Sequence, residues 1–342
     1  MTSKEILETM KVDNDTKNEV IVKVAEFMKK HYVFSEIGEE MGEHIKKKHA
    51  NLEYDSFTDV KDFCKRVTDD LREVSQDRHI FVFFSPEEAV EVAAIKGLLH
   101  EDEKKIIDGQ MYENIRRVNF GFQRIEILNG NIGYLKIDYF PNVNDGAETC
   151  IGAMGFLSNA DALIIDLREN GGGEGLMVDF LSSYFFTSEK VQLNGAYFRE
   201  SDTTEESWTL PYVPGKRMPD TDLYILVSSR TFSAAEDFTY GLQQLKRSVV
   251  IGETTKGGAH PVDVLIVKGS ILTQIPIGNS INPITNTNWE GVGVKPDISV
   301  SAEEALKTAY QLALKNLVKK TKDEKVKEEL TCLIKQSKDL PS

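Results

Sequence analysis

The chain has 342 residues, 40% of them hydrophobic, which is typical of a globular protein with one large domain or two. Its 55 acidic and 41 basic residues give a formal net charge of -14, so its overall field repels phosphate backbones and anionic lipid surfaces. We therefore expect neither a nucleic acid nor a membrane as a partner. Three cysteines, Cys64, Cys150 and Cys332, are far apart and lack CxxC spacing, which argues against a disulfide framework and against a zinc site.

The first residues, Met1–Glu5, lead into a polar helical pattern without the apolar stretch of a signal peptide. No later apolar run approaches the length that spans a membrane. The sequence as written therefore predicts a cytoplasmic protein, or a secreted one if a leader preceded these residues and was removed.

Apolar residues recur at helical spacing in two stretches near the start of the chain: Val20, Val24, Phe27 and Met28, and then Val60, Phe63, Cys64, Val67, Leu71 and Val74. This periodicity predicts a small helical domain over residues 1–75, in which the apolar stripes form a core and not a partner groove. A strand is expected at 79–84, followed by a charged helical stretch to Glu103. Near-alternation over 118–127 and the pair Asn129-Gly130 predict a hairpin into a further strand.

From residue 145 the pattern alternates between helix and strand. We expect helices near 145–158 and 175–186, strands at 162–167, 223–227 and 249–251, and a helix that carries Phe238, Leu242 and Leu245. Strand, helix and strand in this order predict parallel pairing with a right-handed crossover. Active sites in such sheets lie outside the carboxyl ends of the strands, so the loops after Leu167 and around Ser233 are the candidate site. A charged helix that packs on one face is expected near 302–337.

Ser233 is the first candidate catalytic residue. It lies in the run TFSAAE (231–236), directly after the strand at 223–227 and before a helix. A hydroxyl there projects from the first helical turn, where unpaired N–H groups and the helix dipole favour an oxyanion. The alternative is a helix N-cap, because serine is one of the preferred residues at that position.

The loop after the strand at 162–167 has the sequence DLRENGGG (166–173). Three glycines let the backbone approach a ligand and leave N–H groups that can point at an anion, as in an oxyanion hole. The loop lacks the residues of a phosphate-binding loop and the spacing of a dinucleotide fold. A tight turn between strand and helix is the alternative explanation.

Two later segments complete the pattern: IGETTKGGAHP (251–261) and NWEGVGVKPD (288–297). In this order, the four segments resemble the C-terminal-processing (tail-specific) serine proteases, and within them the branch that looks like interphotoreceptor retinoid-binding protein and the tricorn protease core. The resemblance covers roughly residues 75–305, and the helical start is similar to the N-terminal region of the same branch. It implies an α/β fold with a crotonase-like and Clp-protease-like ββα core. We expect an N-terminal helical domain (1–75), a catalytic core (76–305) and a charged C-terminal helix (306–342).

The resemblance also assigns roles to residues. Ser233 falls on the nucleophile of the family. The N–H groups of Ala234 and Gly172 fall on the oxyanion hole. In the tricorn-like branch the base is a histidine from an earlier segment, which His79 matches, and Glu290 matches the late carboxylate that supports the site. This assignment suits the chemistry, because a serine hydroxyl needs a neighbouring base and histidine titrates in the useful range.

Other residues compete for these roles. The processing branch uses a lysine base two positions beyond Lys256, where this chain has Gly258, and there is no room for the peptide-binding PDZ module of that branch. His260 is the rival base, with a loop residue that lines the cleft as its alternative role. Glu236, one turn after Ser233, and Glu253, in a turn, compete with Glu290.

The resulting prediction is a serine peptidase that uses Ser233, His79 and Glu290 and needs neither a metal nor a cofactor. Gly257, Gly258 and His260 are expected to bind the peptide or protein substrate. A second hypothesis is a carrier of apolar ligands, because retinoid-binding relatives show that the architecture also serves binding and fold does not fix function. A third is hydrolysis of a non-peptide ester or amide by the same residues. The sequence leaves the oligomeric state open.

Overall fold

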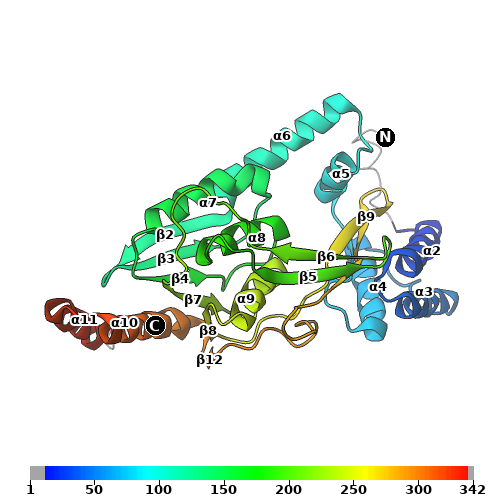
Figure 1. Cartoon of the computed structure of the whole chain (residues 1–342). Helices are drawn as coiled ribbons and strands as arrows, with labels where there is room; N and C mark the ends of the chain where they lie inside the picture. The colour runs from blue at the N-terminus through cyan, green and yellow to red at the C-terminus, as the bar shows by residue number, and fades with distance from the viewer. Residues whose placement is uncertain (1–11, 338–342) are drawn as a thin grey trace. The chain divides into compact units, whose positions relative to one another are not determined.

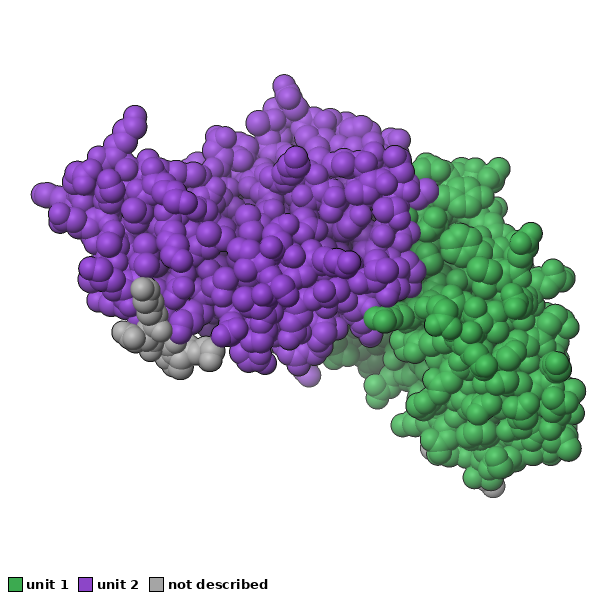
Figure 2. All heavy atoms as spheres, turned by 90° about the horizontal axis from the view of Figure 1, so that it is seen from below, with its two compact units in different colours: residues 1–114, 196–205, 260–280 green, residues 115–195, 206–259, 281–342 purple. Residues whose placement is uncertain are grey.

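The computed structural model describes residues 12–337 (Figure 1). The first eleven residues of the expected N-terminal domain and the last five of the expected C-terminal helix lie outside the described part. The chain divides into two compact units, which Figure 2 colours separately. Unit 1 consists of residues 1–114, 196–205 and 260–280, and unit 2 of residues 115–195, 206–259 and 281–342.

These units are discontinuous, whereas the segments predicted from the sequence, 1–75, 76–305 and 306–342, are contiguous. The difference comes from strand pairing. In unit 1, β1 (Phe81–Phe84) pairs antiparallel with β10 (Ile271–Pro276), which pairs with β9 (Val262–Lys268). Residues that are distant in the sequence are thereby built into the same unit as the first helices.

Unit 1 begins with three helices: α2 (Asn14–His31), α3 (Ser35–Ala50) and α4 (Val60–Ser75). Asp13 and Asp59 cap α2 and α4, because their carboxylates accept main-chain N–H groups of the first turns. The apolar stripes predicted from the sequence are buried together with apolar residues of β9 and β10, which confirms that they form a core. Two further helices follow, α5 (Pro86–Ile95) and α6 (Glu101–Arg117), and α6 has no buried residue among those described.

Unit 2 is built on a six-stranded sheet with the order β12-β8-β7-β4-β3-β2. The strands are β2 (Phe122–Leu128), β3 (Ile132–Ile137), β4 (Ala162–Asp166), β7 (Asp222–Val227), β8 (Val249–Gly252) and β12 (Ile298–Ser299). β2 and β3 form the predicted antiparallel hairpin, and the neighbours from β3 to β12 are parallel, as predicted for the strands in the second half. The fold is therefore mixed α/β with a helical N-terminal region, as expected.

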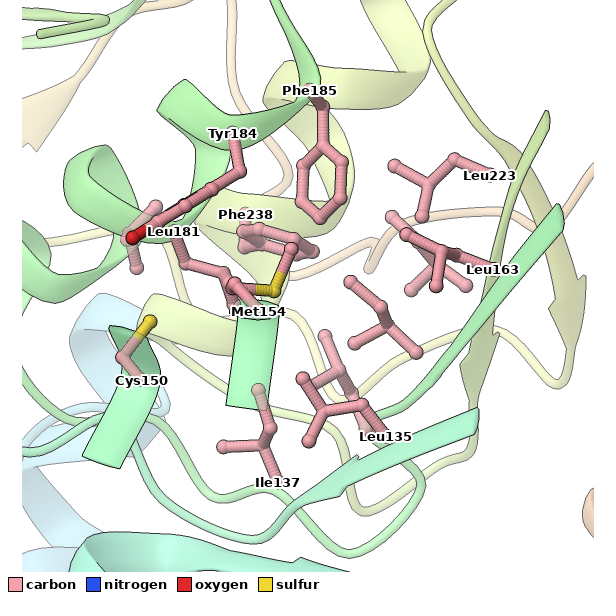
Figure 3. Close-up of a cluster of buried hydrophobic side chains, with 14 of the residues drawn as sticks. Leu135, Ile137, Cys150, Met154, Leu163, Leu181, Tyr184, Phe185, Leu223 and Phe238 are labelled. Carbon is pink, nitrogen blue, oxygen red and sulfur yellow. The ribbon is translucent and has the colours of Figure 1, made fainter. Parts of the chain in front are cut away.

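Both faces of this sheet are covered. α7 (Val143–Leu157), α8 (Gly175–Ser182) and α9 (Ala234–Gln244) contribute to one apolar core, where Met154, Leu181 and Phe238 meet Leu163 of the sheet (Figure 3). A short 3-10 helix, η2 (Ser183–Phe185), extends α8. The other face is covered by α10 (Ala302–Lys320) and α11 (Glu324–Gln336). The single C-terminal helix expected near 302–337 is therefore two helices.

The segment between α8 and β7, which shows no clear periodicity, contains two strands, β5 (Gln192–Phe198) and β6 (Thr203–Trp208). With β11 (Gly278–Ser280) they form a three-stranded sheet in the order β11-β5-β6. A short 3-10 helix, η1 (Asn119–Gly121), precedes β2. Among the helices of residues 12–337, none combines the length and the apolar character needed to cross a membrane.

Candidate active site

Ser233 lies where the sequence predicts it, after β7 and at the N-cap of α9. Its backbone has φ 55° and ψ -124°, a conformation that is strained for a residue with a Cβ. The turn before it is fixed to the glycine loop, since the N–H of Phe232 donates to the carbonyl oxygen of Asn170 at 3.1 Å. Strain of this kind is typical of a nucleophile held on a sharp turn between strand and helix.

The first turn of α9 has one N–H group to offer a ligand. The N–H groups of Glu236 and Asp237 donate to the carbonyl oxygen of Ser233 at 2.8 and 3.0 Å, and the N–H of Ser233 donates to the Glu236 carboxylate at 3.0 Å. In the described part of the chain, the N–H of Ala234 has no hydrogen-bond partner. The helix dipole adds to the attraction of this end for negative charge.

Gly172 lies directly against the nucleophile. A Cβ added to it would be 2.8 Å from the Cβ of Ser233, and its φ of +115° also favours glycine. Its N–H donates to Oδ1 of Asn170 at 2.8 Å, so it can stabilise an oxyanion only if this bond is shared or exchanged. The oxyanion role of Gly172 therefore stays a prediction.

Asn170 is not among the site residues predicted from the sequence. It is fully buried, and its Nδ2 donates to the carbonyl oxygen of Ile137 at the end of β3, at 3.0 Å. Together with the bonds to Gly172 and Phe232, this contact fixes the glycine loop between the sheet and the serine turn. Its position directly before three glycines is the only local signal of this role.

The start of the same loop is held by a buried ion pair. Asp166, at the end of β4, accepts two hydrogen bonds from the Arg168 guanidinium, at 2.9 and 2.6 Å, and one from the hydroxyl of Tyr134 at 2.7 Å. Burial alone raises the pKa of Asp166, but the bonds and charge of Arg168 and the bond from Tyr134 keep it below the ordinary value. The carbonyl oxygen of Arg168 in turn accepts the hydroxyl of Ser228, next to β7.

Glu290 accepts the N–H of Ala259 through Oε2 at 2.6 Å. The neighbouring Trp289 donates its indole N–H to the carbonyl oxygen of Gly258 at 2.9 Å. These contacts fix the main chain of the segment that ends at Ala259. The N–H groups of Gly257 and Gly258 donate to Glu236, so these groups are occupied in the structure, and the substrate-binding role of the two glycines stays a prediction.

Two other candidates in unit 2, Glu253 and Lys256, make contacts that are typical of structural residues. Glu253 accepts main-chain N–H groups of Ser229 and Ala302, at 3.0 and 3.3 Å, as expected for a turn residue. The hydrogen bond from Ser229 is the main cause that lowers the pKa of Glu253. Lys256 places Nζ 4.3 Å from the centre of the Phe232 ring, in a cation–π contact.

His79 belongs to unit 1, lies two residues before β1, and is 2% exposed. Its N–H donates to Oδ1 of Asp77 at 2.9 Å, and its carbonyl oxygen accepts Nε2 of Gln274 at 2.8 Å. These bonds hold the backbone of the predicted base on both sides of the residue.

His260, the rival base, is also in unit 1 and contacts the same aspartate. Its Nδ1 is 2.6 Å from Oδ2 of Asp77, which also accepts the hydroxyl of Tyr32 at 3.1 Å. Burial acts to raise the pKa of Asp77, but the bond and charge of His260 and the N–H of His79 hold it below its ordinary value. An ionised carboxylate on Nδ1 leaves Nε2 as the proton acceptor, which is how an aspartate orients a catalytic histidine. Asp77 is not among the site residues predicted from the sequence.

Two family models match long stretches of the chain. Residues 131–300 match the model of peptidase family S41, and residues 4–128 match the model described as the N-terminal domain of this family in eukaryotic IRBP. The chain belongs to peptidase family S41. The resemblance inferred from the four sequence segments is thereby confirmed at the level of the family.

The tail-specific protease of Haemophilus influenzae is 35% identical over 99 residues, which are 29% of this chain and 13% of that protein. The chain thus spans a small part of the curated relative that it matches. A protein of Parabacteroides merdae assigned as a peptidase is similar in structure, with a TM-score of 0.58, 16% identity, and coverage of 89% of this chain and 97% of the other.

The tricorn protease structure is also similar, with a TM-score of 0.53 and 13% identity. The match covers 95% of this chain and 37% of the tricorn chain. At these identities the two structural likenesses support the fold.

Proposed function

We propose that this S41 chain is a serine peptidase with Ser233 as its nucleophile. The observation that carries the proposal is the strained Ser233, packed against Gly172 and followed by the open N–H of Ala234. Strain at a non-glycine residue is retained where the surrounding structure requires it, and such sites are typically functional. A helix N-cap alone does not need this backbone conformation.

In the proposed reaction, the hydroxyl oxygen of Ser233 attacks the carbonyl carbon of a peptide while His79 takes the hydroxyl proton. The N–H of Ala234, together with an N–H of the glycine loop, stabilises the negative oxygen of the tetrahedral intermediate. The imidazolium then gives its proton to the leaving amine as the C–N bond breaks. Water, deprotonated by the same imidazole, hydrolyses the acyl-enzyme and restores the serine.

The assignment of the base rests on the family resemblance, which favours His79. The contact between His260 and Asp77 supports His260 as the competing base. We propose that Glu290 supports the site by fixing the main chain that precedes His260. Peptides or proteins are the substrates that the family suggests, and the proposed chemistry needs no metal or cofactor.

A fluorophosphonate probe tests the nucleophile, because it reacts with an activated serine and leaves a stable mass label. We expect one label per chain, mapped to Ser233 by peptide mass spectrometry, and no label on folded Ser233→Ala. Undiminished labelling of Ser233→Ala, or no labelling of folded wild-type protein, would refute the proposal. In the latter case, tight binding of a hydrophobic fluorophore would support the alternative of an apolar-ligand carrier.

A further inference from the structure

We propose that Glu236 is a positioning residue for Ser233, and that its carboxylate must be ionised for the nucleophile to react. The inference rests on the proposed role of Ser233. It makes the reactivity of Ser233 depend on the protonation of Glu236 as well as on that of the general base. Glu236 is fully buried on the first turn of α9. It acts through the backbone of Ser233 and does not itself take part in bond making.

The carboxylate of Glu236 accepts hydrogen bonds from two separate parts of the chain. Oε2 accepts the N–H of Ser233 at 3.0 Å and that of Gly258 at 2.8 Å. Oε1 accepts the N–H of Gly257 at 2.6 Å and the hydroxyl of Thr255. One side chain thus ties the strained serine to the segment over residues 255–258.

This link continues to a third segment. The hydroxyl of Thr255, while it donates to Glu236, accepts the N–H of Val294 at 2.7 Å. The carbonyl oxygen of Gly257 accepts the N–H of Gly291 at 3.2 Å. The segment that carries Glu290 is therefore connected to the serine turn through the same carboxylate.

All four partners of Glu236 are donors, and this decides which form of the side chain fits. An ionised carboxylate is an acceptor only and satisfies every partner. A protonated carboxyl would turn its own O–H toward one of these donors, so at least one buried donor would lose its acceptor. Three of the four are main-chain N–H groups, which cannot reverse their direction as a hydroxyl can.

The charged residues nearby have other partners. Lys256 lies in the linked segment, but its Nζ is placed over the Phe232 ring. Asp237, the next residue of α9, accepts the side-chain amide of Asn194. Neutral donors therefore face Glu236 from both α9 and the segment 255–258.

Protonation of this group falls within an accessible pH range. Burial raises the pKa of Glu236 to about 7, against the lowering effect of its four hydrogen bonds. Because this folded pKa lies above the ordinary value of 4.5, the group contributes most stability below pH 4.5, and this contribution is lost as the pH rises through 7. Acidification should therefore reduce reactivity at Ser233 while the Glu236 contribution to stability increases, so unfolding caused by this group cannot explain the loss.

The rate of fluorophosphonate labelling at Ser233, measured against pH, tests the proposal without a known substrate. In wild-type protein, both the base and Glu236 must be deprotonated. The plot of log rate against pH should therefore approach a slope of about two on its acid side. Glu236→Gln removes one titration, so the slope should fall to about one. Its rate at the plateau should fall about 10- to 100-fold, because an amide cannot accept all four bonds and the serine shifts.

Glu253→Gln is the matched control, since Glu253 also accepts two main-chain N–H groups but contacts a different turn. We expect its labelling rate and acid slope to equal those of wild type. A slope of about one in wild-type protein, or equal rates and slopes for Glu236→Gln and wild type, would overturn the inference. The wild-type profile decides the question if Glu236→Gln does not fold. Absence of label at Ser233 in wild-type protein would instead refute the proposed function.

Discussion

Substitution of Gly172 by alanine should displace the nucleophile. The added Cβ would lie 2.8 Å from the Cβ of Ser233 and 3.2 Å from both the nitrogen of Ala234 and the carbonyl oxygen of Phe232. These neighbours belong to a rigid turn and cannot move away as a flexible side chain could. The backbone would also hold alanine at φ +115°, in a region that residues with a Cβ avoid.

The magnitude follows from these two effects. An unfavourable backbone conformation costs about 1–3 kcal/mol, and overpacking of a tight site costs about 1–3 kcal/mol. We therefore expect Gly172→Ala to lower the free energy of unfolding by about 2–6 kcal/mol. A misplacement approaching 1 Å at a reacting group costs on the order of 100-fold in rate, and fluorophosphonate labelling of Ser233 should fall accordingly.

Gly171→Ala is the matched control, because Gly171 is exposed, has no positive φ and has no neighbour within 4 Å of an added Cβ. Urea denaturation followed by circular dichroism measures stability, and intact-mass spectrometry measures the labelling rate. Gly171→Ala should stay within about 0.5 kcal/mol of wild type and label at the wild-type rate. Equal stability and equal labelling of the two variants would refute the argument that Gly172 is needed for close approach to Ser233.

Three further predictions concern groups around the site. His79→Ala should slow labelling by about two to four orders of magnitude, as expected for loss of a general base. Lys256→Ala should retain most of the labelling rate, because its Nζ lies over an aromatic ring. A large loss of labelling rate in Lys256→Ala alone would overturn this choice of base. Glu290→Ala should lower kcat, measured on a peptide that the wild-type protein cleaves, because the variant loses the hydrogen bond that fixes the main chain before His260; an unchanged kcat would remove Glu290 from the mechanism. Burial raises the pKa of Asp179 from 3.8 to about 7, so its stabilising contribution is lost as the pH rises between these values. The Tm gain of Asp179→Asn over wild type, measured by thermal denaturation, should grow from pH 4 to pH 7 and then stay constant, and a gain that is largest at pH 4 would contradict the assigned direction.

Features that depend on neighbouring residues could be predicted from the sequence. Helical spacing located the stripes of α2 and α4, and the pair Asn129-Gly130 located the turn between β2 and β3. The alternation of strands and helices predicted the parallel pairing of β4, β7 and β8. Because a parallel sheet gathers the carboxyl ends of its strands at one edge, the sequence also selected the glycine loop and Ser233 as one candidate site.

Features that depend on distant residues could not be predicted in this way. β6 is largely polar and exposed, so no apolar alternation marks it as a strand. The discontinuous units arise from pairing between β1 and β10, which local patterns do not encode. The break between α10 and α11 was missed because the whole C-terminal segment is charged and favourable to helix.

In the candidate site, too, some features follow from the local sequence and others from contacts between distant residues. The sequence by itself determined which residue types stand at the ends of β4 and β7, because these follow from local order along the chain. Only the tertiary structure decided what each side chain contacts. Asp77 and His260 are 183 positions apart in the sequence and still share a hydrogen bond. Glu236 accepts hydrogen bonds from a segment about 20 residues away. Hydrogen bonds of buried groups are fixed by packing in three dimensions, so they cannot be predicted from residue spacing in a single sequence.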